Sequence, residues 1–457
     1  MKVIVVGTNH AGTTAVRTIR RQDPNAEIVT YDKNDNISFL GCGIALWVAD
    51  EIDNADGLFY ANPDVLKKEN IKVNMEHEVT NIDPIKKEIK VKNLKTNKEL
   101  TDTYDKLILA VGSWPIVPPS IEGLTGEGKL ANIELVKLYQ HGAIVKKANN
   151  DKKIKKVVVC GAGYIGIELV DAFAKSGKDV TLIDIVDRIM PRYYDKPFTD
   201  LVEKGMADKG VKFAGGSTVK KFKGKNGKVT HVITDNGEFE ADLVIWAVGF
   251  RPATAWLKGV VDQSPIGAIV VNEYMQTSNK DIYAVGDCIE VFDNAKKDSA
   301  YLALATTAVR SGIIAATNVV KENSLKSLGF QGSNAINVFD WCLASTGMTE
   351  SVCIERKVDY ELTTFSDADK PEFMHDNNPV TLRIVWNKKD RKIIGAQVAS
   401  QTNHTEVMYM FSLAILKGLT IDELPLLDIF FLPHFNKPYN FITMAGLEVL
   451  GLNYFKK

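Results

Sequence analysis

Residues 156–184 read KVVVCGAGYIGIELVDAFAKSGKDVTLID, and their pattern predicts the fold of this part of the chain. Its apolar, β-branched start, Lys156 to Cys160, predicts a strand that stops abruptly at the glycine turn GAGYIG. A second strand is expected over Asp179 to Ile183, and it ends at Asp184. A strand, a G-x-G-x-x-G turn and a second strand that ends in a carboxylate together indicate a dinucleotide-binding unit.

The carboxylate at the end of that unit indicates which dinucleotide it binds. Asp184 would accept hydrogen bonds from both ribose hydroxyls of NADH and would repel the extra phosphate of NADPH. We therefore predict a preference for NADH. The nearby Arg188 would favour NADPH only if its guanidinium pointed inward.

A second copy of the pattern opens the chain, where Lys2 to Val6 leads into GTNHAG at 7–12. The middle glycine is missing, but the turn follows a strand and precedes a helix-compatible run, Thr13 to Arg20. The next strand ends at Asp32, 20 residues beyond the turn, where a ribose-binding carboxylate is expected. The pyrophosphate is expected at the helix N-terminus, because free backbone N–H groups and the helix dipole favour an anion there.

The composition excludes several classes of protein. The 457 residues are 45% apolar, enough for separate cores in about three domains. A formal net charge of −1 leaves no cationic surplus for binding nucleic acid. The apolar run Val3 to Val6 is too short for an export signal or a membrane span, so we expect a cytoplasmic protein without a membrane partner.

The five cysteines form no C-x-x-C pair and no cluster with metal-ligand spacing, so we expect no disulfide scaffold and no metal. Cys42 lies between two glycines at the expected start of a helix, whose dipole would lower its pKa and favour a thiolate. The nearest cysteine in sequence is Cys160, so Cys42 would cycle to sulfenic acid with a peroxide rather than form a disulfide. His10, in the first glycine turn, could move a proton at neutral pH.

Six motifs, taken in order, resemble the FAD-dependent pyridine-nucleotide disulfide oxidoreductases, and within them the branch of NADH oxidases and NADH peroxidases. They are GTNHAG at 7–12, SFLGCGIALW at 38–47, GAGYIGIE at 161–168, YAVGD at 283–287, LALATTAVRSG at 302–312 and FNKPYN at 435–440. Their order and the lone Cys42 are specific to this branch. The chain is most similar to the water-forming NADH oxidases, and ALW at 45–47 favours an oxidase over a peroxidase.

The resemblance implies an α/β fold with two Rossmann-like dinucleotide-binding domains, one for FAD and one for NAD, and a C-terminal α+β interface domain. Proline and glycine clusters place the boundaries near 115–120 and 248–252, and the pattern of short strands changes near 330. We predict an FAD-binding domain of 1–118 and 249–328, an NAD-binding domain of 119–248 and a dimerisation domain of 329–457. The resemblance also implies a homodimer in which Phe435 reaches the partner's flavin.

Residue roles follow from the motif matches. Cys42 would be redox-active as a sulfenate, His10 the acid/base, and Tyr164 the cover of the flavin's nicotinamide face until NADH displaces it. The residues expected to bind FAD are Gly7, Asn9, His10, Ala11, Gly12, Asp32, Lys33, Cys42, Val79, Ala110, Gly112, Ser113, Gly286, Asp287, Leu304, Ala305, Thr306 and Phe435. Those expected to bind NADH are Gly161, Gly163, Tyr164, Ile165, Gly166, Asp184, Tyr193 and Gly249.

The implied reaction is O₂ + 2 NADH + 2 H⁺ → 2 H₂O + 2 NAD⁺, with Cys42 cycling between thiolate and sulfenic acid. An NADH peroxidase would use the same residues on H₂O₂. A coenzyme A disulfide reductase would also use one cysteine and would add a basic groove for the nucleotide phosphate. A reductase of an electron-carrier protein would not need Cys42, and a non-catalytic FAD sensor would bind a flavin that is insensitive to redox chemistry.

Overall fold

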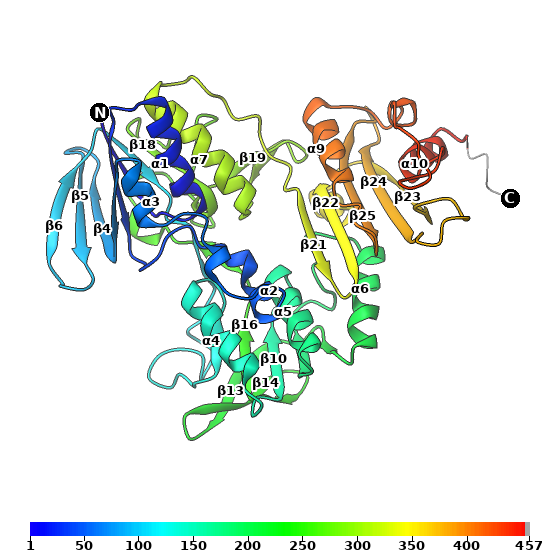
Figure 1. Ribbon diagram of the computed structural model, residues 1–457, viewed down its shortest axis with the longest axis horizontal. Helices are drawn as coiled ribbons and strands as arrows, with labels where there is room; N and C mark the ends of the chain where they lie inside the picture. Colours follow the sequence, from blue (N-terminus) through cyan, green and yellow to red (C-terminus); the bar gives the residue numbers. More distant parts are fainter. Residues whose placement is uncertain (453–457) are drawn as a thin grey trace.

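The computed structural model describes residues 1–452 as three lobes, each built on its own five-stranded sheet (Figure 1). The first lobe carries the N-terminus, the second hangs below it, and the third holds the C-terminal part of the chain. None of the helices within residues 1–452 is long and apolar enough to cross a membrane.

The sheet of the first lobe is parallel throughout, in the order β18-β7-β1-β2-β3. Its strands are β1 (Lys2–Val6), β2 (Glu27–Asp32), β3 (Ile71–Met75), β7 (Lys106–Leu109) and β18 (Ile282–Ala284). Helices α1 (His10–Gln22) and α7 (Ala305–Val320) pack closely together, because Gly312 has no side chain at their contact. An added Cβ there would lie 2.7 Å from the Ala11 carbonyl oxygen. An antiparallel sheet of β4 (His77–Asp83), β5 (Glu88–Asn93) and β6 (Glu99–Thr103) extends this lobe.

The second lobe repeats the architecture, with a parallel sheet in the order β12-β11-β10-β16-β9. Its strands are β9 (Ile133–Leu135), β10 (Lys156–Cys160), β11 (Asp179–Ile183), β12 (Lys212–Ala214) and β16 (Leu243–Trp246). Its helices are α4 (Tyr139–Asn150), α5 (Tyr164–Lys175) and α6 (Lys196–Asp208). A small antiparallel sheet of β13 (Val219–Lys225), β14 (Lys228–Thr234) and β15 (Glu238–Glu240) completes it.

Two connections join these lobes and run side by side. The outgoing strand β8 (Ser113–Pro115) pairs antiparallel with the returning strand β17 (Phe250–Pro252). After β17 the chain returns to the first sheet through β18, so the first lobe is built from two separate parts of the sequence.

The third lobe is an antiparallel sheet in the order β21-β22-β25-β24-β23, flanked by helices. Its strands are β21 (Asn334–Val338), β22 (Trp341–Gly347), β23 (Tyr360–Ala368), β24 (Pro379–Asn387) and β25 (Ile393–Ser400). Its helices are α8 (Glu350–Arg356), α9 (Val407–Lys417) and α10 (Phe441–Val449). The expected fold class is therefore confirmed: two parallel α/β units and a C-terminal α+β unit.

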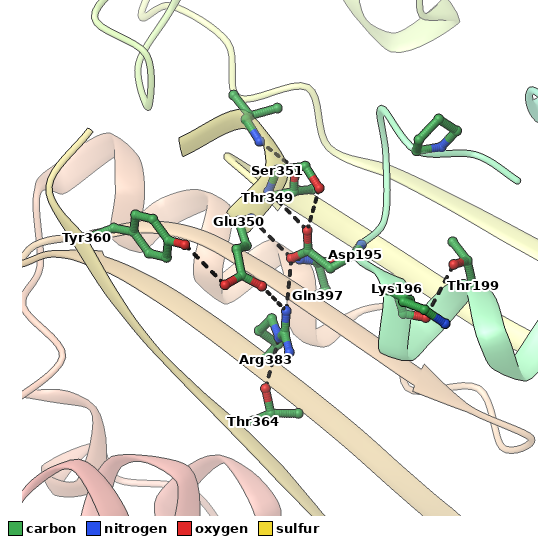
Figure 2. Close-up of polar contacts among 12 residues, drawn as sticks. Asp195, Lys196, Thr199, Thr349, Glu350, Ser351, Tyr360, Thr364, Arg383 and Gln397 are labelled. Atoms are coloured by element: carbon green, nitrogen blue, oxygen red, sulfur yellow. Dashed lines mark hydrogen bonds and ion pairs between the residues drawn. The ribbon is translucent and has the colours of Figure 1, made fainter. Parts of the chain in front are cut away.

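Buried polar residues connect the second lobe to the third (Figure 2). Asp195, which precedes α6, accepts hydrogen bonds from Gln397 Nε2 at 2.5 Å and from the Glu350 backbone N–H at 3.0 Å. Arg383 pairs with Glu350 at 2.8 Å and lies 3.4 Å from Asp195. Asp195 and Arg383 are buried, and buried charges are stable only when paired and hydrogen-bonded, so these contacts fix how the two lobes meet.

Candidate active site

A large cavity, about 2380 Å³ in volume, lies where the three lobes meet. Its walls come from the glycine turns of both parallel sheets, the start of α7, and strands and helices of the third lobe. It is therefore open to two dinucleotides at once, since each glycine turn offers one binding position.

Two positions of the first glycine turn, Gly7 and Gly12, have no room for any residue other than glycine. Gly7 has φ +95°, and an added Cβ would lie 2.3 Å from the Ala110 carbonyl oxygen. A Cβ at Gly12 would lie 1.9 Å from the Gly7 carbonyl oxygen. Helix α1 begins at His10, and Asn9 caps it without a side-chain hydrogen bond. The first backbone N–H groups of α1 are thus available for a phosphate.

Asp32 ends β2 beside this turn and is buried. Its Oδ2 accepts the Thr8 N–H at 2.7 Å, and its Oδ1 accepts the Asn34 N–H at 2.8 Å. Thr8 Oγ1 and Asn34 Nδ2 also donate to these two oxygens, at 2.8 Å and 2.9 Å. The carboxylate is therefore held rigidly at the cavity wall, and a ribose hydroxyl would bind it by replacing one of the two side-chain donors.

A second polar group lies where β18 ends, in the turn that contains Asp287. Ser113 Oγ donates to Asp287 Oδ2 at 2.8 Å, and Lys137 Nζ lies 3.0 Å from Ser113 Oγ and 3.3 Å from Asp287 Oδ2. The Lys137 ammonium also lies 4.8 Å from the centre of the Phe250 ring. Ser113, Lys137 and Asp287 together can donate hydrogen bonds to a polyhydroxyl chain and accept hydrogen bonds from it. Lys137 was not among the predicted site residues, because it meets Asp287 across 150 residues of chain.

The second glycine turn repeats the geometry of the first. Gly161 has φ +110°, and a Cβ at Gly166 would lie 1.8 Å from the Gly161 carbonyl oxygen. Asp184 accepts the Ala162 N–H at 2.6 Å and the Val186 N–H at 2.9 Å. The carboxylate therefore faces its own turn, at the end of β11 where the sequence places the ribose.

Arg188 lines the cavity, but its guanidinium contacts protein groups. Its Nη2 lies 3.5 Å from the Pro191 carbonyl oxygen and 3.4 Å from Ser351 Oγ of the third lobe. In this arrangement it is directed toward the third lobe.

Tyr164, the first residue of α5, projects into the cavity between two other aromatic residues. Its ring meets that of Tyr193 edge-on, with centroids 4.6 Å apart. Its hydroxyl hydrogen-bonds the Tyr194 hydroxyl at 2.7 Å and donates to Asn334 Oδ1. Burial raises the pKa of Tyr164 far above its ordinary value, so the hydroxyl stays protonated.

Cys42 lies in a short 3₁₀ turn, Gly41–Gly43, and is exposed to the cavity. The prediction of a lowered thiol pKa is wrong for this structure: partial burial and the nearby Glu168 carboxylate raise the pKa of Cys42. The helix that follows, α2 (Ile44–Val48), has only five residues. Backbone N–H groups of Cys42 and Gly43 lower the thiol pKa, but by less than burial and Glu168 raise it.

The other four cysteines do not line this cavity. Cys160, Cys288 and Cys353 are buried, and Cys342 is partly buried. Residues 1–452 include all five cysteines, and among them only Cys42 lines the cavity. Cys42 therefore has no cysteine partner within its own chain.

His10 stacks on Tyr60, with ring centroids 5.6 Å apart and Nδ1 3.2 Å from the Tyr60 hydroxyl. Burial lowers the pKa of His10, the Asp287 carboxylate raises it, and the Lys137 ammonium lowers it further. The net direction is down, so the imidazole is neutral near pH 7 and can accept a proton.

Glu168, four residues beyond Tyr164 on α5, also lines the cavity and was not among the predicted site residues. Burial raises the pKa of its carboxyl to about 7. Two sequence signals point to Glu168: it ends the motif GAGYIGIE, and it lies four residues from Tyr164, a spacing that puts both on one helix face.

Of the predicted site residues, the cavity gathers Gly7, Asn9, His10, Ala11, Asp32, Lys33, Cys42, Val79, Ala110, Gly112, Ser113, Gly286, Asp287, Leu304, Ala305, Thr306, Gly163, Tyr164, Ile165, Tyr193 and Gly249. It does not include Gly12, Gly161, Gly166, Asp184 and Phe435. Gly12 and Gly166 pack against their own turns, whereas the Phe435 side chain is exposed in the segment before α10.

Comparison with known proteins gives consistent matches over the whole chain. Residues 1–312 match the family model of pyridine nucleotide-disulphide oxidoreductases, and residues 334–439 match that family's dimerisation domain. An NADH oxidase of Streptococcus pyogenes is 47% identical over 455 residues, covering 98% of this chain and 99% of the relative.

Solved structures agree with this assignment. The water-forming NADH oxidase of Lactobacillus brevis, bound to NADH, superposes with a TM-score of 0.94 at 39% identity, covering 99% of this chain and 98% of that one. Reduced Bacillus anthracis CoADR-RHD also has a TM-score of 0.94, at 28% identity, covering 99% of this chain and 80% of that one.

Proposed function

Because the chain belongs to the pyridine nucleotide-disulphide oxidoreductases, we propose that it is an FAD-dependent NADH oxidase that reduces O₂ to water through Cys42. One observation carries the proposal: a cavity reached by two dinucleotide-binding turns contains one cysteine with no cysteine partner. Such a site favours a sulfenic acid over a disulfide as its oxidised state.

The residues of the first lobe fit FAD. The glycine turn at Gly7 and the free N–H groups at the start of α1 suit its pyrophosphate, and Asp32 suits a ribose. Asp287 and Ser113 suit the hydroxyls of a ribityl chain. When bound, FAD would accept hydride from NADH and pass electrons on, chemistry that no side chain supplies.

The second turn would hold NADH. The N-terminus of α5 suits its pyrophosphate, and Asp184 at the end of β11 would accept hydroxyls of its adenosine ribose. Tyr164 and Tyr193 occupy the part of the cavity that the nicotinamide would enter, so NADH would have to displace at least the Tyr164 ring.

Cys42 and His10 would carry out the oxygen chemistry. The Cys42 thiolate attacks one oxygen of H₂O₂, its S–O bond forms as the O–O bond breaks, and Cys42 becomes sulfenic acid with release of hydroxide. His10 accepts the thiol proton at the start and returns it to the hydroxide as water. Two electrons from a second NADH return the sulfenic acid to thiolate. The H₂O₂ would itself come from O₂, reduced with the two electrons of the first NADH (O₂ + NADH + H⁺ → H₂O₂ + NAD⁺). The sum is then O₂ + 2 NADH + 2 H⁺ → 2 H₂O + 2 NAD⁺.

A homodimer is part of the proposal. Large apolar side chains lie exposed in the segment before α10, among them Leu426, Phe430 and Phe435, at 82%, 69% and 59% exposure. Exposed apolar surface of this extent is typical of an interface. Phe435 does not line the cavity of its own chain, which fits a role at the partner's flavin.

The stoichiometry of NADH and O₂ consumption, measured in air-saturated buffer with and without catalase, tests the proposal. We expect two NADH per O₂ and no effect of catalase. One NADH per O₂ with accumulating H₂O₂ would contradict water formation, and oxidation that requires added H₂O₂ would indicate a peroxidase. The variant Cys42→Ser should still oxidise NADH but release H₂O₂, whereas Cys353→Ser, at a buried cysteine outside the cavity, should leave the stoichiometry unchanged.

A further inference from the structure

The side chain that holds Tyr164 in place comes from the third lobe. Asn334, the first residue of β21, accepts a hydrogen bond at Oδ1 from the Tyr164 hydroxyl, and the Tyr194 hydroxyl lies 3.1 Å from the same oxygen. The two tyrosine hydroxyls also bond each other at 2.7 Å. The Tyr164 hydroxyl, the Tyr194 hydroxyl and Asn334 Oδ1 thus lie within hydrogen-bond distance of one another, two from the second lobe and one from the third.

The amide of Asn334 is itself fixed. Its Nδ2 donates to the Gly332 carbonyl oxygen at 2.8 Å and to Ser345 Oγ at 2.9 Å. Both amide N–H groups are therefore used, and Oδ1 is left facing the tyrosines. A flipped amide would present donors to both hydroxyls and lose its own two acceptors.

Tyr194 is held just as firmly. It is fully buried, and its hydroxyl also lies 3.3 Å from the Leu343 carbonyl oxygen of β22. The next residue, Asp195, is fixed by Gln397 and Arg383 of the third lobe (Figure 2). Contacts with the third lobe therefore fix the position of Tyr164 in two ways. Asn334 contacts it directly, and the Tyr194–Asp195 segment that it contacts is itself held by the third lobe.

We propose that Asn334 is a positioning residue that holds Tyr164 over the nicotinamide site, so that NADH must break the Tyr164–Asn334 hydrogen bond to bind. This rests on the proposed function in taking NADH as the ligand of the second turn and in placing its nicotinamide at Tyr164. Part of the binding free energy of NADH is then used to release Tyr164, and the third lobe sets the affinity for the nucleotide.

The test compares binding with catalysis in the FAD-loaded enzyme. Asn334→Ala should bind NAD⁺ roughly 3- to 10-fold more tightly, the equivalent of one neutral hydrogen bond that no longer has to be broken. Calorimetric titration with NAD⁺ measures this directly. In anaerobic stopped-flow experiments the dissociation constant for NADH should fall by the same factor, while the limiting rate of flavin reduction stays within about twofold of wild type.

Two further variants separate positioning from general loosening. Ser333→Ala removes the neighbouring hydroxyl of the same segment, which bonds Thr346 Oγ1 at 2.7 Å, and should leave the NAD⁺ affinity unchanged. Tyr164→Phe removes the same hydrogen bond together with the bond to the Tyr194 hydroxyl, and should tighten NAD⁺ binding at least as much as Asn334→Ala. The double variant Asn334→Ala with Tyr164→Phe should then gain little beyond Tyr164→Phe alone.

Unchanged or weaker NAD⁺ binding by Asn334→Ala, or gains that add fully in the double variant, would overturn the proposal. If Asn334→Ala failed to retain FAD, Tyr164→Phe alone would decide, since it does not alter the third lobe. Failure of the proposed oxygen chemistry would appear separately, as a changed NADH to O₂ ratio, because NAD⁺ binding and anaerobic flavin reduction involve no oxygen.

Discussion

Replacing Glu168 by glutamine should stabilise the enzyme at alkaline pH and leave it nearly unchanged at acid pH. Burial raises the pKa of this carboxyl from 4.5 to about 7. Between those values the folded chain holds a proton that the unfolded chain has lost, so the stability of the wild type falls as pH rises from about 4.5 and stops falling above about 7. Glutamine has the shape of the protonated carboxyl and carries no charge to desolvate.

The magnitude follows from the size of the shift. A rise from 4.5 to about 7 at about 1.4 kcal/mol per unit corresponds to about 3 kcal/mol of penalty above pH 7. Glu168→Gln removes that penalty, which corresponds to a gain in melting temperature of roughly 6–12 °C at pH 8.5 if the second lobe unfolds as one unit. At pH 5 the gain should be below about 1 kcal/mol, because the folded carboxyl is already protonated.

Melting temperatures of wild type and variant, measured by scanning fluorimetry from pH 5 to pH 8.5, test this expectation. The exposed Glu127 provides a matched control, and Glu127→Gln should shift the melting temperature by no more than about 1 °C at any pH. A gain from Glu168→Gln of equal size at pH 5 and pH 8.5 would refute the reasoning, since it would then reflect packing and not ionisation.

Three other outcomes follow from the same site. Because the Glu168 carboxylate raises the pKa of Cys42, Glu168→Gln should shift the pH profile of Cys42 alkylation by iodoacetamide toward lower pH, and an unmoved profile would contradict that link. Because the pKa of His10 is lowered, the rate of peroxide consumption should stay level through pH 7 and fall only below the ordinary histidine range; a fall beginning above pH 7 would rule out neutral His10 as the base. Gly12→Ala places a Cβ 1.9 Å from the Gly7 carbonyl oxygen and should reduce bound FAD per chain at least 10-fold, whereas Gly57→Ala, with no atom within 4 Å of its Cβ, should keep full FAD absorbance.

The parts of the fold that could be predicted are those that depend on residues close together in the sequence. Gly7 and Gly161 are required by positive φ and by crowding against a neighbouring carbonyl, and such requirements leave a readable pattern. Helix α9 (Val407–Lys417) and the hairpin β24–β25 also depend on local signals, apolar periodicity and turn composition.

The groups that the sequence did not predict depend on contacts between distant segments. Lys137 reaches Asp287, and Asn334 reaches Tyr164, across 150 and 170 residues of chain. No local pattern marks either partner. The thiol pKa of Cys42 was predicted in the wrong direction for the same reason: the helix start was visible in the sequence, but the burial and the Glu168 carboxylate that outweigh it were not.

The split construction of the first lobe has a consequence for biosynthesis. Strand β7 (Lys106–Leu109), which is mostly apolar, is synthesised early. Strand β18, which pairs with its outer edge, is synthesised only after all the strands of the second sheet. At ribosomal rates of roughly 5–20 residues per second, the intervening ~175 residues take about 10–35 s. During that interval β7 presents an unpaired apolar edge, the kind that recruits other chains. The second lobe, although later in sequence, can therefore finish folding first. Chaperone binding should be strongest for nascent chains that contain β7 but do not yet contain β18.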